Sequence, residues 1–430
     1  MSEGAAKNEN RRKFQAIKGS RDILPPETAL WNRVEQTAHE VFSTFGYGEI
    51  RLPVLEPTEL FARSIGLNTD VVSKEMYTFE DHDVQGLETI RSHLLRDFDL
   101  HPGPGDARFI TTGLNQFLAA ANQEIKRGTL SRTPEIATAL RRLEQDMQFF
   151  SGVSTTLAAA DYASQTNETR STLRDMQWGV EVALRPEATA SVCRAYIEHN
   201  MQQLPQPVKL YYMGPMFRRE RPQKGRYRQF YQIGAEVLGG PDAPAIDAEL
   251  IEMLMTFFDQ LGLEGTTLYI NSIGCRNCRP QYVELLRAEL TKIKDKLGAD
   301  SQRRIETNPL RVLDSKLESE QPHIEKLPRI ADHLCEECKT HYAAVKRELD
   351  LRNVKYQENW RLVRGLDYYM RTTFEITAPG LGSQNAVCGG GRYDGLVELL
   401  GGPPTKGIGF AIGEDRLILS LQESGKGRAL

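Results

Sequence analysis

The chain has 430 residues, a formal net charge of -4 and 40% hydrophobic residues. This length predicts two to four domains, and the hydrophobic content is sufficient for sizeable cores. No apolar run is long enough to span a bilayer, and residues 1–13 are polar and charged, without the apolar core of a signal peptide. We therefore expect residues 1–13 to form a disordered tail. Six cysteines are too few for a disulfide scaffold in so long a chain, which favours the reducing cytoplasm.

The stretch over residues 84–178 has a helical pattern. It predicts three helices, over residues 114–127, 133–150 and 168–178, the second of which starts at Thr133-Pro-Glu135. Positive and negative charges nearly balance in this stretch, so electrostatics do not mark it as an RNA-binding surface. We expect a helical inserted domain, which is either an inert surface module or a contact for RNA or a partner protein.

The motif Leu184-Arg-Pro-Glu-Ala-Thr-Ala190 lies between a predicted strand over residues 180–184 and a predicted helix over residues 191–200. Glu187 and Thr189 are able to face a pocket and hold an ammonium group. A carboxylate in the first turn of a helix is also favoured by the helix dipole alone. A purely structural role for Glu187 therefore stays open.

A cationic loop follows, in which six of the eleven residues from Arg218 to Arg228 are basic. Strand-like runs over residues 208–213 and 230–238 flank it, which predicts two antiparallel strands joined by a long basic loop. Arginine binds phosphate through two parallel hydrogen bonds, and the strands would hold the side chains in place. We expect a phosphate-binding loop, with a solvated charged hairpin as the alternative.

Residues 263–354 form a further expected unit, with two Cys-x-x-Cys pairs. The pairs are Cys275 with Cys278 and Cys335 with Cys338. Two such pairs are a typical ligand set for tetrahedral zinc, although the spacer between them is long. We consider a structural zinc site, with four reduced thiols as the alternative. Because the cysteines would fill four coordination positions, His333 and His341 are expected at the surface.

Three motifs lie toward the C-terminus. Arg364-Gly-Leu-Asp-Tyr-Tyr369 leads into a predicted strand over residues 372–376, and its tyrosines suit a pocket that reads a polar ring. The run over residues 385–395 contains three consecutive glycines, which allow close approach of backbone to a ligand. Residues 407–417 predict a strand leading into a helix whose first amides, with Arg416, favour a triphosphate. A structural loop and a capped strand–helix junction are the alternatives for the first and third motifs.

In this order, these segments resemble the motifs of class II aminoacyl-tRNA synthetases, and specifically those of the histidyl-tRNA synthetase family. Arg51-Leu-Pro53 with Glu56 resembles motif 1, residues 217–236 resemble motif 2, and residues 407–417 resemble motif 3. The R-G-L-D-Y-Y and G-G-G-R-Y-D-G runs resemble the two histidine signatures of that family. The start of the chain, over residues 16–25, also fits the family. The resemblance covers residues 14–83 and 179–423, about three quarters of the chain.

The resemblance implies an α+β fold with a class II antiparallel sheet flanked by helices, two mainly helical inserted domains and a homodimeric assembly. The catalytic core would consist of residues 14–83, 179–262 and 355–430, with insertions over residues 84–178 and 263–354. The implied reaction uses ATP and Mg²⁺ to convert histidine to histidyl-adenylate, and then transfers the histidyl group to the 3′ end of tRNA(His).

The resemblance also implies roles for individual residues. Arg218 and Arg364 match the catalytic arginines at the α-phosphate. The ATP-binding positions are matched by Arg218, Arg226, Phe230 and Arg416. The histidine pocket is matched by Glu187, Thr189, Gln232, Glu236, Tyr368 and Tyr369. Magnesium is expected near Glu220 or Glu236.

The chain departs from the family in three places. Ala188 stands where the family has glycine, about 95 residues intervene before Gly179, and the chain stops at Leu430 without the expected anticodon-binding domain. The main alternative is therefore a paralogue that shares the catalytic fold and lacks that domain. Such a paralogue would sense histidine as a regulatory subunit of histidine biosynthesis without charging tRNA. Erosion of the catalytic arginines would mark it, so the presence of Arg218, Arg364 and Arg416 favours the ligase.

Overall fold

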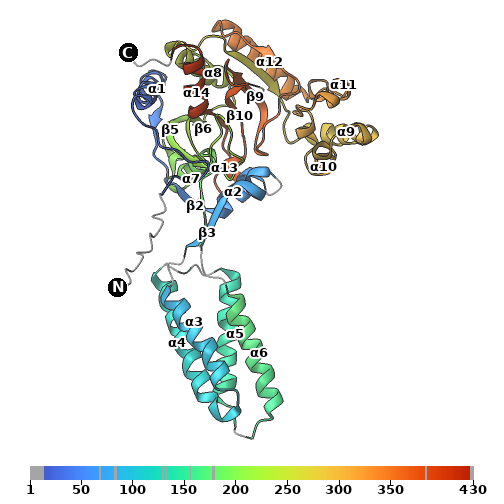
Figure 1. Ribbon diagram of the computed structural model, residues 1–430. Coiled ribbons are helices and arrows are strands. Elements are labelled where there is room, and N and C mark those ends of the chain that lie inside the picture. The colour runs from blue at the N-terminus through green and yellow to red at the C-terminus, as the bar shows by residue number, and fades with distance from the viewer. Residues whose placement is uncertain are drawn as a thin grey trace, which may run out of the picture. The chain divides into compact units, whose positions relative to one another are not determined.

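The computed structural model describes residues 14–66, 69–81, 85–127, 130, 133–154, 156–176, 180–382 and 385–426. The chain divides into two compact units (Figure 1), one formed by residues 78–182 and the other by the residues on both sides of that segment. We call them the helical unit and the sheet unit and describe each by itself. The tail expected over residues 1–13 lies outside the described residues. No helix in the described ranges is long and apolar enough to cross a membrane.

The centre of the sheet unit is an eight-stranded sheet with the order β1-β5-β6-β11-β10-β9-β7-β8. In that order the strands span Gly48–Glu49, Val208–Phe217, Gln229–Leu238, Gly407–Gly413, Ala386–Arg392, Met370–Thr377, Thr267–Ser272 and Gln357–Glu358. The neighbouring strands from β5 to β7 are antiparallel, which confirms the expected fold class. The two edge strands differ, because β1 and β8 pair parallel with their neighbours. Both are reached by long connections, which parallel pairing requires.

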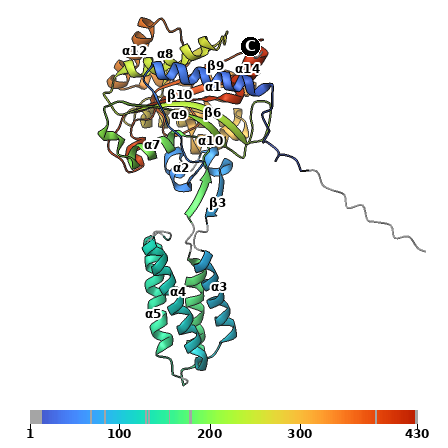
Figure 2. The same ribbon diagram turned by 90° about the vertical axis from the view of Figure 1, so that its left-hand side faces the viewer.

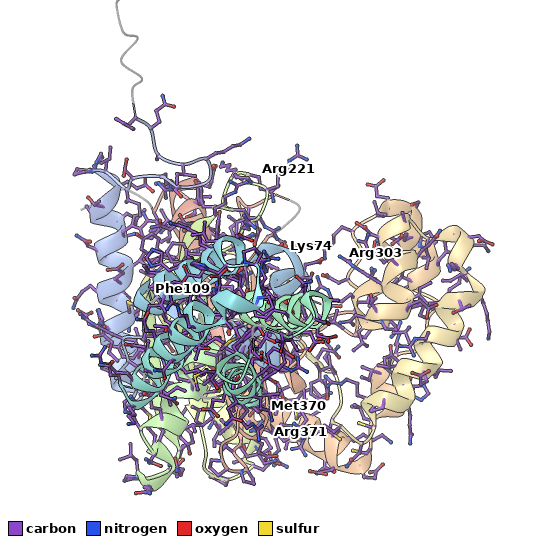
Figure 3. The ribbon with its side chains drawn as sticks, turned by 90° about the horizontal axis from the view of Figure 1, so that it is seen from below. Lys74, Phe109, Arg221, Arg303, Met370 and Arg371 are labelled. Atoms are coloured by element: carbon purple, nitrogen blue, oxygen red, sulfur yellow. The ribbon has the colours of Figure 1, made fainter. Side chains whose placement is uncertain are left out.

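The predicted hairpin around the basic loop is present as β5 and β6. Phe217 pairs with Gln229, so residues 218–228 form the loop between the strands. The N–H of Arg218 donates to the carbonyl of Arg228 at 2.9 Å and closes the base of that loop. Arg221, near the middle of the loop, points away from the strands (Figure 3). The strands therefore present the first and last residues of the loop at fixed positions.

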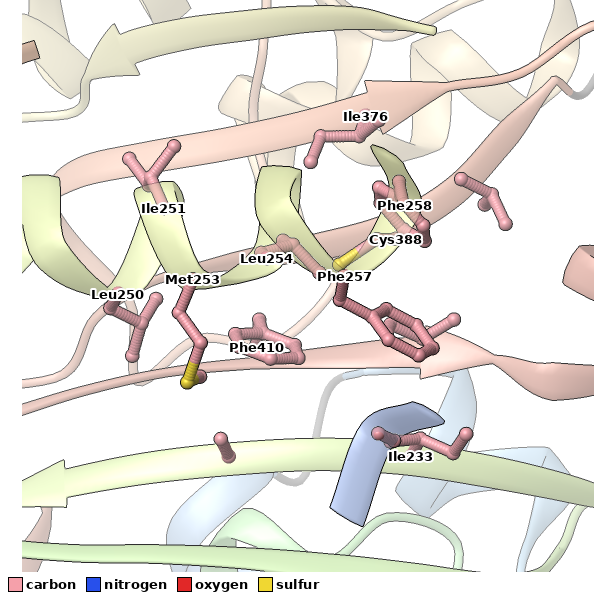
Figure 4. Close-up of a cluster of buried hydrophobic side chains, with 14 of the residues drawn as sticks. Ile233, Leu250, Ile251, Met253, Leu254, Phe257, Phe258, Ile376, Cys388 and Phe410 are labelled. Atoms are coloured by element: carbon pink, nitrogen blue, oxygen red, sulfur yellow. The ribbon is translucent and has the colours of Figure 1, made fainter. Parts of the chain in front are cut away.

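Helices cover both faces of the sheet (Figure 2). One face is covered by α1 (Glu27–Thr44), α8 (Pro244–Gln260), α12 (Glu336–Leu351) and α14 (Glu414–Glu423). The α8 side chains Leu254 and Phe257 are fully buried and lie over Phe410 of β11 and Ile233 of β6 (Figure 4). Burying each such side chain contributes about 1.5–3 kcal/mol. This core packs the four helices against the strands of the sheet.

The other face carries a second core. Its helices are α2 (Thr58–Ile65), α7 (Thr189–Glu198), α9 (Arg279–Lys292), α10 (Ala299–Thr307), α11 (Gln321–Ile324) and α13 (Leu396–Leu399). A π-helical turn spans Val71–Glu75, and 3₁₀ turns in this unit span Met201–Gln203, Lys294–Lys296, Pro309–Val312, Glu318–Glu320 and Ile330–His333. Both ends of the 263–354 segment join the central layers, since β7 lies in the sheet and α12 contributes Val345 and Leu349 to the first core.

The helical unit contains four α-helices among its described residues. They are α3 (Gln85–Leu100), α4 (Ala107–Arg127), α5 (Pro134–Ser151) and α6 (Ala159–Asp175), with a 3₁₀ turn over Pro104–Asp106. The predicted start of α5 is confirmed, because the Thr133 side chain accepts a hydrogen bond from the N–H of Ile136 at 3.2 Å. Helix α4 begins before the predicted residue 114, α6 begins before residue 168, and α3 was not predicted.

The chain enters and leaves the helical unit through β3 (Tyr77–Asp81) and β4 (Val180–Leu184). These strands belong to a small sheet of order β2-β4-β3, with β2 over Leu55–Pro57.

Candidate active site

A cavity of about 240 Å³ lies on the sheet unit where the basic loop meets β6, β9, β10 and β11. It brings together six of the residues predicted from the sequence. They are Arg218, Arg226, Phe230, Gln232, Arg364 and Arg416. Four of these are arginines from three separate parts of the chain. A cavity with four guanidinium groups in its lining favours a ligand with several negative charges.

Hydrogen bonds and ion pairs fix the arginines. Arg218 Nε donates to the carbonyl of Pro186 at 2.9 Å, and its guanidinium lies 5.3 Å from the Phe230 ring. Arg226 pairs with Glu220 at 3.4 Å, and Arg364 Nη1 donates to Glu375 Oε2 at 3.0 Å. These contacts hold Arg218, Arg226 and Arg364 at the cavity.

The glycine run explains how Arg364 reaches the cavity. A Cβ atom placed on Gly389 would lie 2.0 Å from Arg364 Nη2, much closer than any real contact. A larger residue at 389 would displace the Arg364 guanidinium, because the arginine passes directly over the backbone of β10. Close approach of a ligand to these glycines stays a prediction, and the neighbour that the structure places against Gly389 is a side chain of the same chain.

A second buried cluster holds the acidic residues and tyrosines. Thr189 Oγ1 donates to Glu236 Oε1 at 2.7 Å, and Tyr368 Oη donates to Glu187 Oε2 at 3.3 Å. The rings of Tyr368 and Tyr369 lie 4.7 Å apart. Tyr393 Oη donates to Glu236 Oε2 at 2.6 Å. The structure thus gathers five of the predicted pocket residues at one place and adds Tyr393, which the sequence analysis missed.

Glu187 has the structural role that the sequence left open, and its ammonium-binding role stays a prediction. Its carboxylate oxygens accept hydrogen bonds from the N–H groups of Thr189 at 2.8 Å and Ala190 at 3.0 Å, at the start of α7. It therefore caps the helix while one of its oxygens also meets Tyr368. Burial raises the pKa of Glu187, and the hydrogen bonds from Ala190 and Thr189 oppose that rise.

Glu236 is a second carboxyl group in this cluster with a raised pKa. Burial raises its pKa to about 8, against the opposing effect of the hydrogen bonds from Tyr393 and Thr189. Gly409 of β11 makes room for it, since a Cβ there would lie 1.6 Å from Glu236 Oε2. This environment thus favours a protonated Glu236 at neutral pH. Because Glu236 is absent from the cavity lining while Glu220 is present, only Glu220 of the two carboxylates considered for magnesium faces the arginines.

Two polar atoms at the cavity have no hydrogen-bond partner within the described residues. They are Gln232 Oε1 and Arg364 Nε, and both are buried. Leaving a buried polar atom unpaired costs about 1–3 kcal/mol, so a ligand in the cavity that pairs with these two atoms would gain from it. Glu375 and Asp415 also line the cavity and were not predicted.

Ala188, which replaces the glycine of the family pattern, has φ -116°, a conformation that any residue adopts.

The four cysteines also come together. Sγ–Sγ distances are 3.8 Å for Cys275–Cys278 and Cys275–Cys335, and 3.9 Å for Cys278–Cys338. All four sulfurs lie within 4.8 Å of one another. Tetrahedral zinc with Zn–S bonds of ~2.3 Å requires sulfurs ~3.8 Å apart, so this geometry fits zinc. The separations are far longer than the ~2.05 Å of a disulfide bond.

The two histidines near the cysteines differ from each other. His333 is exposed, as expected. The expectation that His341 lies at the surface is wrong, because only 7% of it is exposed. Its Nε2 lies 3.8 Å from oxygens of Asp242 and Asp247, in a buried network of charges, and burial lowers its pKa. Neither histidine belongs to the cluster of sulfur ligands.

A mainly antiparallel sheet with an arginine-lined cavity on the second and third motifs defines the core of a class II aminoacyl-tRNA synthetase. A family model described as histidyl-tRNA synthetase matches residues 149–417. Histidine–tRNA ligase of Koribacter versatilis is 47% identical over 413 residues, covering 95% of this chain and 74% of that protein. The corresponding ligase of Solibacter usitatus is 45% identical over 410 residues, covering 95% and 76%.

A solved structure agrees with these relatives. The crystal structure of apo S. aureus histidyl-tRNA synthetase has a TM-score of 0.60 and 32% identity, covering 96% of this chain and 75% of that one. The chain belongs to the histidyl-tRNA synthetase family. It spans about three quarters of the length of these relatives.

Proposed function

We propose that this chain is a histidine–tRNA ligase, which forms histidyl-adenylate from histidine and ATP and transfers the histidyl group to the 3′ end of tRNA(His). The observation that carries the proposal is the junction between the two parts of the site. Arg218 of the arginine-lined cavity donates to the carbonyl of Pro186, and the next residue is Glu187 of the acidic cluster. A bound amino acid and a bound triphosphate would therefore meet at Arg218.

The arginines serve the first step. The histidine carboxylate attacks the α-phosphorus of ATP, an O–P bond forms, and pyrophosphate leaves with the electrons of the broken bond. Charge spreads over the phosphoryl oxygens, so fixed cations and correct positioning provide the catalysis. Arg218 and Arg364 are assigned to the α-phosphate. Arg226 and Arg416 are assigned to the outer phosphates, and Phe230 offers a ring on which adenine stacks.

The acidic cluster serves recognition of histidine. Glu187 and Thr189 offer oxygens to the ammonium group, and the unpaired Gln232 Oε1 at the cavity is available to the same end of the ligand. Glu236 and the tyrosines at 368 and 369 are assigned to the imidazole ring. A site built to hydrogen-bond its substrate rejects an analogue without those groups by roughly 10⁴-fold or more.

Magnesium enters this reaction with ATP, and it neutralises charge on the phosphates when bound. Glu220 fits that use, because its carboxylate lines the cavity between Arg218 and Arg226. Zinc is assigned a structural role at the four cysteines. The sulfur spacing supports that assignment, as does the burial of Cys275, Cys278 and Cys338.

The proposal includes the wider setting of the enzyme. The ligase works as a homodimer in the cytoplasm, with tRNA(His) as its partner. Residues 14–83, 179–262 and 355–430 supply the catalytic core, and residues 84–178 and 263–354 are insertions in it. Family membership supports these assignments. Sedimentation analysis tests the homodimer, and tRNA-binding assays test the partner.

The decisive experiment is histidine-dependent exchange of pyrophosphate into ATP, followed by aminoacylation of tRNA(His). We expect exchange with histidine and none with phenylalanine, which lacks the ring nitrogens. Histidine binding without exchange in the intact chain would overturn the ligase and favour the regulatory paralogue. Exchange without aminoacylation would overturn only the second step.

A further inference from the structure

Arg371 lies between the four-cysteine cluster and the tyrosines of the acidic cluster. It follows Tyr369 and Met370 in the chain, at the start of β9 (Figure 3). Its φ is 50°, in the left-handed region that residues with a side chain rarely adopt. Only 5% of the residue is exposed. Such a conformation persists only where surrounding contacts impose it, so those contacts are informative.

The backbone of Arg371 holds the first cysteine pair. Its N–H donates to the carbonyl of Gly274 at 2.8 Å, and its own carbonyl accepts from the N–H of Ile273 at 2.9 Å. Gly274 directly precedes Cys275. Arg279, which directly follows Cys278, donates through Nη1 to the carbonyl of Tyr369. The first pair is therefore bonded at both of its ends to the segment that contains the tyrosine.

The side chain of Arg371 holds the second cysteine pair. Nη2 donates to Glu337, which stands between Cys335 and Cys338 in sequence. Nη1 donates to Asp242 Oδ2 at 2.6 Å. Burial raises the pKa of Asp242, but hydrogen bonding to Arg371 and the nearby Arg392 outweigh it and bring the pKa down to about 2. The Asp242 carboxylate therefore faces Arg371 in its charged form, and the hydrogen bond between two charged groups is strong.

The same segment reaches the acidic cluster in the other direction. Two residues before Arg371, Tyr369 packs against Tyr368 with the two rings tilted by 46°, and the Tyr368 hydroxyl donates to Glu187. A displacement of Arg371 would thus move the backbone that positions both rings. Because protein interiors are closely packed, even a small shift changes the hydrogen-bond distances available to a ligand.

We propose that Arg371 is a positioning residue that couples occupancy of the four cysteines by zinc to the affinity of the site for histidine. With the metal bound, the two cysteine pairs would be held together as one rigid body. Arg371 is bonded to the first pair through its backbone and to the second pair through its side chain. Without the metal, the pairs separate and the tyrosines lose their fixed position. This inference rests on the proposed histidine site.

The first test removes the metal. Reduced protein is stripped of zinc with a chelator, zinc content is measured by elemental analysis, and binding of histidine and of ATP is measured by calorimetry. We expect the Kd for histidine to rise at least fivefold, the Kd for ATP to stay within twofold, and zinc to restore the histidine affinity. An unchanged histidine Kd in verified zinc-free protein would overturn the coupling, and so would the absence of zinc from freshly prepared, reduced protein.

The second test separates positioning from general stability. Arg371→Gln keeps an unbranched side chain but removes the charge, and Arg303→Gln is the matched control, since that arginine is exposed on α10 (Figure 3). We expect Arg371→Gln to raise the histidine Kd at least fivefold with the ATP Kd within twofold, and Arg303→Gln to change neither. Arg371→Lys, which keeps a charge for one carboxylate, should recover part of the affinity.

A double-mutant cycle links the two tests. Cys335→Ser with Cys338→Ser should weaken histidine binding, and adding Arg371→Gln should weaken it little further, because both changes release the same contact. Multiplication of the separate effects would overturn the coupling. These measurements use binding, so they stay distinct from the proposed activity: a zinc-dependent histidine Kd without pyrophosphate exchange would reject the ligase and keep the coupling.

Discussion

Arg364 shows how one residue depends on a neighbour that is distant in sequence. Its guanidinium passes over Gly389, donates to Glu375 and lies 5.9 Å from the ring of Tyr369. The arginine is thus placed at the boundary between the cavity and the acidic cluster. Its buried Nε has no partner among the described residues, so it is available to a ligand.

We expect Arg364→Ala to lower histidine-dependent pyrophosphate exchange by roughly 10²–10³-fold, because it removes a fixed cation from the developing charge. Histidine binding should remain, since the ammonium and imidazole partners are other residues. Arg303→Ala, at an exposed position, is the control and should exchange at the parent rate. Exchange at the parent rate in Arg364→Ala would remove this arginine from the mechanism.

Glu236 predicts a pH dependence of stability. Its folded-state pKa of about 8 lies above the ordinary value of 4.5. Between these two pH values the Glu236 carboxyl is protonated in the folded chain and ionised in the unfolded chain. The stabilisation is complete below about pH 4.5 and is lost as pH rises through 8. Gln cannot ionise and resembles the protonated acid. We therefore expect Glu236→Gln to gain about 2–4 kcal/mol of unfolding free energy relative to the parent between pH 5 and 8.

Urea unfolding at several pH values measures this difference. The control is Glu264→Gln, because the side chain of Glu264 is 81% exposed and its replacement should show no pH-dependent difference. A constant difference between Glu236→Gln and the parent from pH 5 to pH 8 would show that Glu236 ionises normally in the folded chain.

At the scale of elements, α14 begins with a carboxyl group in an unfavourable place. Glu414 is fully buried, and neither of its oxygens has a hydrogen-bond partner within the described residues. Burial raises its pKa well above the ordinary value, and the nearby Glu35 and Asp415 add to the rise. A negative charge at the start of a helix normally gains about 0.3–1 kcal/mol from the helix dipole. Here the cost of burial is larger.

We therefore expect Glu414→Leu to stabilise the sheet unit by about 1–3 kcal/mol at pH 7, since it replaces an unpaired polar group by an apolar one of similar size. Because the pKa is raised, this gain should shrink as pH falls toward 4.5. Glu423→Leu, near the exposed end of the same helix, is the control and should stay within about 0.5 kcal/mol. A less stable Glu414→Leu protein in urea unfolding would contradict this account.

The elements that the sequence predicted well have local signals. The strand predicted over residues 180–184 is confirmed with the same bounds. It was predictable because V-E-V-A-L contains two β-branched residues and is followed by the proline-containing R-P-E. Helix α3 was missed although Leu87, Ile90, Leu94 and Phe98 follow helical spacing. The parallel edge strands have only two residues each, and nothing in so short a stretch indicates its partner.

The site shows the same division. Gln232 and Glu236 lie on one strand four residues apart, so their common face follows from the alternation of side chains. Tyr393 was missed because it meets Glu236 across 157 residues of sequence, through the order of β6, β11 and β10. His341 was misjudged because its burial depends on Asp242 and Asp247, which reach it from another part of the chain.

At the scale of the whole molecule, the helical unit has its own core, including Leu94, Phe117, Phe150 and Tyr162. We therefore expect it to be dispensable for adenylate formation. Replacing Val84 to Trp178 by Asn-Gly should keep pyrophosphate exchange within about tenfold, or roughly 1.4 kcal/mol of transition-state stabilisation, since loop length has little effect on closure cost. Any larger loss should fall on aminoacylation. A folded deletion protein that forms no adenylate would show that this unit contributes to the active site.

The position of the helical unit within the chain also affects how the protein is made. On the ribosome, residues 78–182 emerge after α1 and α2 but before β5 and β6, the first long strands of the central sheet. At 5–20 residues per second, their synthesis takes ~5–20 s, far longer than a helical bundle with mainly local contacts needs to fold. During that interval the apolar faces of α1 and α2 stay exposed, because the segments that bury them have not yet been made. A nascent chain of this protein is therefore expected to recruit chaperones before residue 208 is made, and slower translation of the helical unit should lower the yield of folded enzyme.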